Sequence, residues 1–258
     1  MNDTASTPVL SLKGVSKSFG PVQALSEVDF EVRQGEVVAL VGDNGAGKST
    51  LVKVIAGIHP ADEGTVSFEG NEVTITGPSD AVALGIATVY QDLALCDNLD
   101  VVENLYLGRE KAAEGPVGAA GQLDEVAMEK RTGELLENLA VTITDLRAEV
   151  GTMSGGQRQQ VAIARSLLGE PKLVMLDEPT AALGVRQTAQ VLALIKRLKE
   201  QGHAVLVISH NLADVFEVAD RIFVLRLGQE AGDFAADRTN QEQVVAAITG
   251  AKSNGGER

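Results

Sequence analysis

Residues 37–49 read VVALVGDNGAGKS, in which an apolar run leads directly into a G-x-x-x-x-G-K-S pattern at residues 42–49. The run predicts a buried strand, and the residues after the pattern predict a helix. Glycines let the loop curl so that successive N–H groups point at one anion, and the helix adds its positive N-terminus. The stretch therefore predicts a phosphate-binding loop rather than a chance glycine-rich turn. Lys48 would reach the β and γ oxygens of a nucleotide, and the Ser49 hydroxyl would bind Mg²⁺.

Two further apolar runs, LVML at residues 173–176 and AVLVI at residues 204–208, are short and rich in branched side chains. Such runs fit strands that are covered on both faces, as in a parallel sheet. Between them, the apolar residues from Val191 to Leu198 recur at helical spacing. The order strand, helix, strand predicts an α/β fold with a mainly parallel sheet.

The rest of the chain follows two other patterns. Residues 9–32 alternate in polarity and residues 64–75 contain a turn around Glu69 to Asn71, which together predict an antiparallel β side sheet. Residues 92–168 turn helical, with predicted helices at 99–107, 124–139 and 155–168. We expect one domain over residues 1–258, with residues 1–91 and 169–258 as the α/β core and residues 92–168 as an inserted α-helical subdomain. Residues 111–122 are predicted to form a mobile loop, and the ends, 1–8 and 251–258, to fray.

The composition excludes several classes of protein. The chain of 258 residues has 22 basic and 36 acidic side chains and a formal charge of −14, which disfavours a nucleic-acid partner. Its one cysteine, Cys96, cannot form an internal disulfide. No apolar segment is long enough for a membrane span and the first residues do not resemble a signal peptide. We therefore expect a protein of the cell interior that does not cross the membrane on its own.

Asp177 and Glu178 directly follow the predicted strand at residues 173–176. Two acids at the carboxyl end of a strand, next to a phosphate loop, fit two roles. Asp177 would hold Mg²⁺, directly or through water, and Glu178 would orient and deprotonate the attacking water. In isolation, Asp-Glu before a proline is often only a turn and a helix cap. The phosphate loop favours the functional interpretation.

The sequence Ser154-Gly155-Gly156-Gln157 opens a predicted helix, with Ser154 as its N-cap. Capping alone is one interpretation. The two glycines also leave N–H groups unshielded at a helix N-terminus, which makes a second anion site possible.

Taken together, these motifs resemble those of the nucleotide-binding subunit of an ATP-binding cassette (ABC) transporter, over residues 9–250 and in the family's order. The resemblance implies a P-loop NTPase core, ATP and Mg²⁺ as cofactors, and a head-to-tail dimer of two copies. In the dimer the signature of one chain would contact the γ-phosphate held by the other. The resemblance assigns the signature to Ser154, Gly155, Gly156 and Gln157. It assigns ATP binding to Phe19, Gly42, Asp43, Asn44, Gly45, Ala46, Gly47, Lys48, Ser49 and Thr50.

Three more positions take a role from the resemblance. Gln91 matches the family glutamine that senses Mg²⁺ and nucleotide and links them to the membrane subunits, so it joins Ser49 and Asp177 as a metal ligand. His210 matches the switch histidine and, with Glu178 and Gln91, completes the catalytic set. Phe19 lies where the family stacks an aromatic ring on adenine. Without the resemblance, the glutamine would be interpreted as surface, the histidine as structural and the phenylalanine as core.

One position departs from the family pattern. After Glu178-Pro179-Thr180 the family commonly reads S-A-L-D, and this chain reads Ala181-Ala182-Leu183-Gly184. Gly184 therefore replaces an aspartate that usually bridges the two subunits. No phosphate or Mg²⁺ ligand is lost, so we expect ATP hydrolysis to survive with altered communication between the two sites.

Residues 91–110 and the A-A-L-G sequence are most similar to ATPases of simple-sugar importers, in a single-cassette form such as the fructose or ribose type. The resemblance implies ATP-driven monosaccharide import, permease subunits in the membrane and, indirectly, an extracellular solute-binding protein. It implies a location at the cytoplasmic face of the cell membrane. Import of amino acids or other small solutes is the alternative, followed by a soluble ABC ATPase without a transport role.

Overall fold

The computed structural model describes residues 7–115 and 121–251. The predicted fraying falls almost wholly outside these ranges, as does the centre of the predicted loop at residues 111–122. Within the described residues the strands are β1 (Leu10–Phe19), β2 (Val22–Val32), β3 (Val37–Val41), β4 (Glu63–Phe68), β5 (Asn71–Val73), β6 (Ile86–Val89), β7 (Leu173–Asp177), β8 (Ala204–Ile208), β9 (Arg221–Arg226) and β10 (Gln229–Ala235). The helices are α1 (Lys48–Ile55), α2 (Pro78–Leu84), α3 (Val101–Tyr106), α5 (Glu125–Asn138), α6 (Gly155–Leu167), α7 (Val185–Glu200), α8 (Leu212–Val218) and α9 (Gln241–Thr249), with short 3₁₀ turns η1 (Val150–Thr152) and η2 (Ala236–Arg238).

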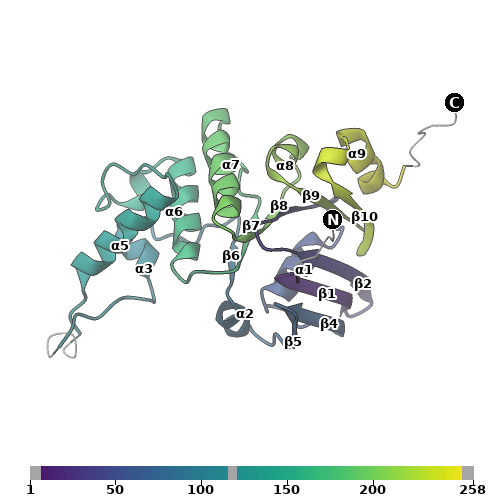
Figure 1. The fold of residues 1–258 in the computed structure, drawn as a ribbon, viewed down its shortest axis with the longest axis horizontal. Coiled ribbons are helices and arrows are strands. Elements are labelled where there is room, and N and C mark those ends of the chain that lie inside the picture. The colour runs from purple at the N-terminus through teal and green to yellow at the C-terminus, as the bar shows by residue number, and fades with distance from the viewer. Residues whose placement is uncertain (1–6, 116–120, 252–258) are drawn as a thin grey trace, which may run out of the picture.

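The main sheet has the strand order β10-β9-β3-β8-β7-β6 among the described residues (Figure 1). Neighbours from β9 to β6 run parallel, and β10 pairs antiparallel with β9. All of Val37–Val41 is buried, because helices and the second sheet cover both faces. Branched side chains tolerate this two-sided burial well. The predicted mainly parallel sheet is confirmed.

The second sheet, ordered β2-β1-β4-β5, is antiparallel throughout. Its last hairpin turns at Glu69 and Gly70, which both have positive φ, 50° and 79°. Two positive φ values give the turn the twist that matches paired strands. The predicted antiparallel side sheet is confirmed, and α1 lies between it and the main sheet (Figure 1).

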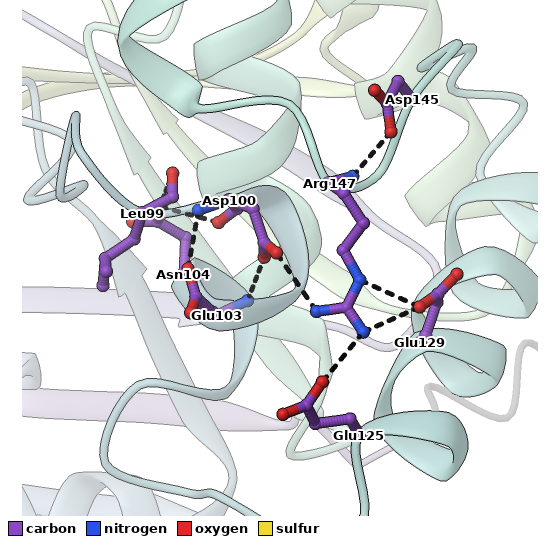
Figure 2. A network of polar contacts seen from close by, with 8 residues as sticks. All are labelled: Leu99, Asp100, Glu103, Asn104, Glu125, Glu129, Asp145 and Arg147. Atoms are coloured by element: carbon purple, nitrogen blue, oxygen red, sulfur yellow. Dashed lines mark hydrogen bonds and ion pairs between the residues drawn. The ribbon is translucent and has the colours of Figure 1, made fainter.

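The helices α3, α5 and α6 lie together beyond the β6 edge of the main sheet (Figure 1). Each lies within the corresponding predicted segment. Arg147 joins two of them, because its guanidinium contacts Asp100 at the start of α3 and Glu125 and Glu129 on α5 (Figure 2). The hydrogen bonds that Arg147 donates to Glu129 and Asp100 raise the pKa of its guanidinium. The network fixes the loop between α5 and η1 against both helices.

Several elements were not predicted from the sequence: α2, α8, β9, β10 and α9. The helices among them are short, and β10 is an exposed edge strand with polar residues, which weakens its periodicity. The described flanks of the predicted loop are also more regular than expected, because Ala113 N donates to Gln122 O at 2.9 Å and Asp124 N to Lys111 O at 2.8 Å. None of the helices built from described residues is long and apolar enough to cross a membrane.

Candidate functional site

The predicted site residues converge because four parallel strands end at one edge of the main sheet. In sheet order, β3 leads into Gly42, β8 into His210, β7 into Glu178 and β6 into Gln91. The carboxyl edge of a parallel sheet is where α/β proteins bind ligands. Residues far apart in the sequence are therefore neighbours at this edge.

The loop at residues 42–49 leaves β3 and enters α1 through backbone conformations that favour glycine. Gly42 has φ 153° and Gly47 has φ 104°. A Cβ on Gly47 would lie 2.7 Å from the carbonyl oxygen of Ala24, and a Cβ on Gly42 would collide with the Leu225 carbonyl. The backbone approach that these glycines permit shapes a cavity of about 520 Å³. The cavity lining includes residues 44–50, Val22, Gln23, Ala24, Leu227 and Gly228.

Lys48 folds back over this loop. Its amine donates hydrogen bonds to the carbonyl oxygens of Gly42 at 2.7 Å and Asp43 at 3.0 Å. Burial lowers the pKa of Lys48, and the carboxylates of Glu178, Asp43 and Asp177 oppose that shift. The cation is thus held at the loop by partners that a phosphate oxygen could replace.

Asp177 and Glu178 lie at the end of β7, between the phosphate loop and β6. Burial raises the pKa of Asp177, the charge of Glu178 raises it further, and Lys48 and Lys53 oppose the rise. Glu178 has φ 49°, a left-handed conformation that is strained for a residue with a Cβ. Its N–H donates to Ile208 O at 2.9 Å, which fixes it to β8.

Glu178 and His210 form the most informative contact of the site. The Nδ1 atom of His210 lies 2.8 Å from Oε1 of Glu178, although the two residues are 32 positions apart. The His210 side chain is 74% exposed and that of Glu178 is 17% exposed. A mostly buried carboxylate beside an exposed imidazole can accept a proton from a water on the solvent side.

The Ser154 motif caps α6 as predicted. The Ser154 hydroxyl accepts from Gln157 N at 3.3 Å, and the Gln157 side chain accepts from Ser154 N at 3.1 Å. Gly156 is buried against α7, where a Cβ would lie 2.9 Å from the Cβ of Gln187. In Figure 1, α6 lies with the helices on the left and α1 beside the side sheet on the right. No signature residue lines the cavity at the phosphate loop, so this chain does not bring its two candidate anion sites together.

The other predicted positions are exposed. Gln91 follows β6 on the surface, and its neighbour Tyr90 lies close enough to Asp177 for that charge to raise the Tyr90 pKa further, after the larger effect of burial. The ring of Phe19, 43% exposed, makes an edge contact with His59 at 5.1 Å between centroids. Phe19 does not line the cavity at the phosphate loop.

Sequence reasoning missed residues that shape this site. Val22 and Leu227 line the cavity and are 61% and 75% exposed, which is unusual for large apolar side chains. The sequence gives a weak signal for Val22, since it follows the Gly-Pro turn, and none for Leu227. Gln187 was also missed, and its side chain accepts from Gly184 N at 3.0 Å and thereby caps α7.

Comparison with known proteins is consistent with this geometry. A family model described as ABC transporter matches residues 25–181. The chain is 44% identical to the xylose/arabinose import ATP-binding protein XylG of Sulfolobus acidocaldarius, over 93% of this chain and 94% of that protein. It is 43% identical to the fructose import ATP-binding protein FrcA of Rhizobium meliloti, over 96% of each. A ribose import ATP-binding protein RbsA of Chromobacterium violaceum is 40% identical, over 93% of this chain and 47% of that protein.

Solved structures agree with the sequence comparison. The ADP conformation of an ATP-binding cassette of an ABC transporter matches with a TM-score of 0.80 and 30% identity, over 95% of this chain and 96% of that one. A dimeric cassette in a post-hydrolysis state, bound to ADP and Pi, matches with a TM-score of 0.72 and 26% identity, over 88% and 98%. The fold is that of the P-loop NTPase cassette. The chain therefore belongs to the ABC transporter family, as one of its ATP-binding cassettes.

Proposed function

We propose that this chain is the ATP-hydrolysing subunit of an importer that carries a monosaccharide across the cell membrane. As an ATP-binding cassette of the ABC transporter family, the chain is an ATPase. The observation that best supports hydrolysis is the contact between Glu178 and His210 beside the phosphate loop. Sugar import is supported by relatives named for xylose/arabinose and fructose import, which match nearly the full length of the chain.

The residues at the sheet edge fit ATP and Mg²⁺. A cavity of about 520 Å³ beside the glycine loop is within the size range of small-molecule sites. Residues 42–50 would hold the phosphates. Among the described residues no three His, Cys, Asp or Glu side chains cluster as a metal site. Mg²⁺ commonly keeps water and phosphate oxygens as ligands, so Ser49, Asp177 and Gln91 are enough protein ligands.

Glu178 is the proposed general base. Bound Mg·ATP supplies a γ-phosphoryl group whose transfer to water releases ADP and phosphate. Glu178 accepts the proton of that water, and His210 keeps the carboxylate oriented through the 2.8 Å contact. Lys48 and the loop N–H groups stabilise the negative charge of the phosphates.

A second copy of the chain is the proposed partner at the signature. Ser154 and Gly156 open a helix remote from the phosphate loop of the same chain, so they are available to a nucleotide held by another copy. A dimeric structure among the similar cassettes supports this arrangement. Gly184 leaves the start of α7 without an acidic side chain at the proposed interface, which is why we expect altered communication between the sites.

The membrane subunits are the other proposed partner. Three large side chains, Tyr90, Val82 and Leu107, are 37%, 58% and 48% exposed, and Tyr90 directly precedes Gln91. Together they line one groove at the β6 edge, where a permease could receive the movement of Gln91. We propose that residues 92–168 move as a helical subdomain against a core of residues 1–91 and 169–258. The proposed location is the cytoplasmic face of the membrane, with an extracellular solute-binding protein as an indirect partner.

Uptake measurements test the transport role. Cells with and without the gene are given a panel of labelled monosaccharides, with amino acids as controls, and Glu178→Gln serves as the inactive variant. Loss of uptake of one sugar in the deletion and in the variant is the expected result. Loss of amino-acid uptake alone supports the alternative solute class. If no uptake changes and no integral membrane protein co-purifies with the chain, the transport role is wrong.

A further inference from the structure

The backbone that follows Gln91 is held by side chains and, at Asp97 and Leu99, by backbone hydrogen bonds from η1. No strand or helix is formed between Val89, the end of β6, and Val101, the start of α3. Ala94 in this segment has φ 48°, a conformation that is strained for a residue with a Cβ and needs support from its surroundings. The support comes from the signature helix α6 and from α3.

Arg165, in the last turn of α6, makes the most direct contacts. Its Nη1 donates to the Ala94 carbonyl oxygen at 2.7 Å and its Nη2 to the Leu93 carbonyl oxygen at 3.0 Å. The guanidinium is half-buried, and within the described part of the chain no carboxylate forms an ion pair with it. Burial lowers the pKa of Arg165, and the nearby charge of Arg109 lowers it further. These two carbonyls are therefore the groups that compensate the buried charge, and such charge-assisted bonds are strong.

Other contacts attach the rest of the segment to the same helices. Arg158 of α6 pairs with Asp97 at 2.9 Å. The side-chain amide of Asn104 on α3 is fully buried, and its nitrogen lies within hydrogen-bond distance of the carbonyl oxygens of Cys96, Leu99 and Asp100. Its oxygen accepts from Cys96 N at 2.8 Å. Figure 2 shows the contacts with Leu99 and Asp100. The segment from Leu93 onward thus belongs with α3 and α6, while Val89 remains paired in the main sheet.

We infer that Arg165 is a positioning residue that makes the Gln91 loop and the signature helix a single moving part. Ser154 caps the N-terminus of α6, and Arg165 lies on the same helix about 16 Å further along at 1.5 Å per residue. A helix transmits a displacement along its axis, so a shift of Ser154 towards a nucleotide moves the backbone next to Gln91. The inference rests on the proposed roles of Ser154 and Gln91, and it adds the residue that connects them.

The test compares substitutions of Arg165 in the purified chain. Arg165→Met keeps a long apolar stem and removes both donors, whereas Arg165→Lys keeps the charge and can reach one carbonyl. The neighbouring Arg109 is exposed and makes no side-chain hydrogen bond to the segment among the described residues, so Arg109→Met is the matched loss of charge. Each variant is measured for ATP affinity, for the ATP hydrolysis rate at saturation, and for amide hydrogen exchange of residues 93–97.

We expect Arg165→Met to bind ATP with Kd within about twofold of the parent, because the phosphate loop is untouched, while kcat falls by about tenfold or more, as misplaced catalytic groups do. Exchange at residues 93–97 should rise, Arg165→Lys should recover part of both effects, and Arg109→Met should match the parent.

Parental kcat together with unchanged exchange in Arg165→Met overturns the inference and leaves the ATPase assignment intact. If the parent does not hydrolyse ATP, the proposed function fails, and the exchange data still show whether Arg165 holds the segment. If Arg165→Met does not fold, Arg165→Lys decides by the same two measurements.

Discussion

At the scale of single residues, Glu178 combines strain with a defined partner. Its φ of 49° is supported by the hydrogen bond from Glu178 N to Ile208 O. Strained non-glycine backbone concentrates at functional sites, where the surrounding fold supports it. The strained conformation occurs at the residue that contacts His210, so it orients the Glu178 carboxylate towards that side chain.

Glu178→Gln is expected to keep ATP affinity and to lose kcat by about 10²- to 10⁴-fold, because the amide cannot accept the water's proton. Phosphate release at saturating ATP measures kcat, and calorimetry measures binding. Glu137→Gln, on the exposed face of α5, is the control and should match the parent. Parental turnover in Glu178→Gln would contradict the assignment of the base.

Asp177 gives a pH-dependent prediction. Its pKa in the folded chain lies above the ordinary 3.8, first because of burial and then because of Glu178. At pH values between 3.8 and the raised pKa, Asp177 is protonated in the folded chain and ionised in the unfolded chain. Proton binding by Asp177 therefore adds to the free energy of unfolding; the contribution is complete below pH 3.8 and is lost as the pH rises through the raised pKa.

Asp177→Asn stays neutral at every pH and should therefore exceed the parent in free energy of unfolding near pH 7, without nucleotide or Mg²⁺. The difference should shrink as the pH falls towards about 4. Urea unfolding at a series of pH values measures it. A difference that does not depend on pH would show that burial of the charge is not the cause.

At the scale of elements, the start of α6 packs against the start of α7 through a glycine. A Cβ on Gly156 would lie 2.9 Å from both Cβ and Cγ of Gln187, whereas a Cβ on Gly155 would lie 3.3 Å from the more mobile end of Leu183. Gln187 also caps α7. The signature and the segment after Glu178 are thus coupled by packing.

Gly156→Ala is expected to lower the free energy of unfolding by about 1–3 kcal/mol through overpacking. Gly155→Ala should cost less, because its contact is longer and can relax. Thermal melting measures both, and Gln187→Gly, which removes both contacting carbons, should cost less stability in the Gly156→Ala chain than in the parent. Equal costs at the two glycines would argue against the packing explanation.

At the scale of the whole molecule, the phosphate loop and the signature lie apart within one chain, because no signature residue lines the cavity at the phosphate loop. A mixture of Lys48→Ala and Ser154→Ala chains provides a direct test of sharing. In a head-to-tail dimer of the two variants, the intact phosphate loop of one meets the intact signature of the other. We expect the mixture to hydrolyse ATP faster than either variant alone, measured at constant total protein. Simple averaging of the two rates would mean that each chain works by itself.

Much of the fold could be predicted from local pattern. Branched apolar runs gave β3, β7 and β8, turn residues gave the β4–β5 hairpin, and a serine cap gave the start of α6. Among the elements that escaped, the helices α2, α8 and α9 have seven to nine residues and β10 is an exposed edge strand, so few residues define their period. For the site, the loop at residues 42–49 and the acids 177 and 178 were readable from the residues, whereas Gln91, His210 and Phe19 needed a resemblance.

The sequence by itself determined the phosphate loop, the acidic pair and the capped glycines, because each depends on neighbours within a few residues. Only the tertiary structure decided which of them meet. The strand order β3-β8-β7-β6 places Glu178 against His210. The packing of α6 positions Arg165 against Leu93 and Ala94 and keeps Ser154 away from the cavity at Lys48. Such contacts join segments 32 to 72 residues apart. They follow from strand pairing and helix packing across the whole chain, which no local pattern encodes.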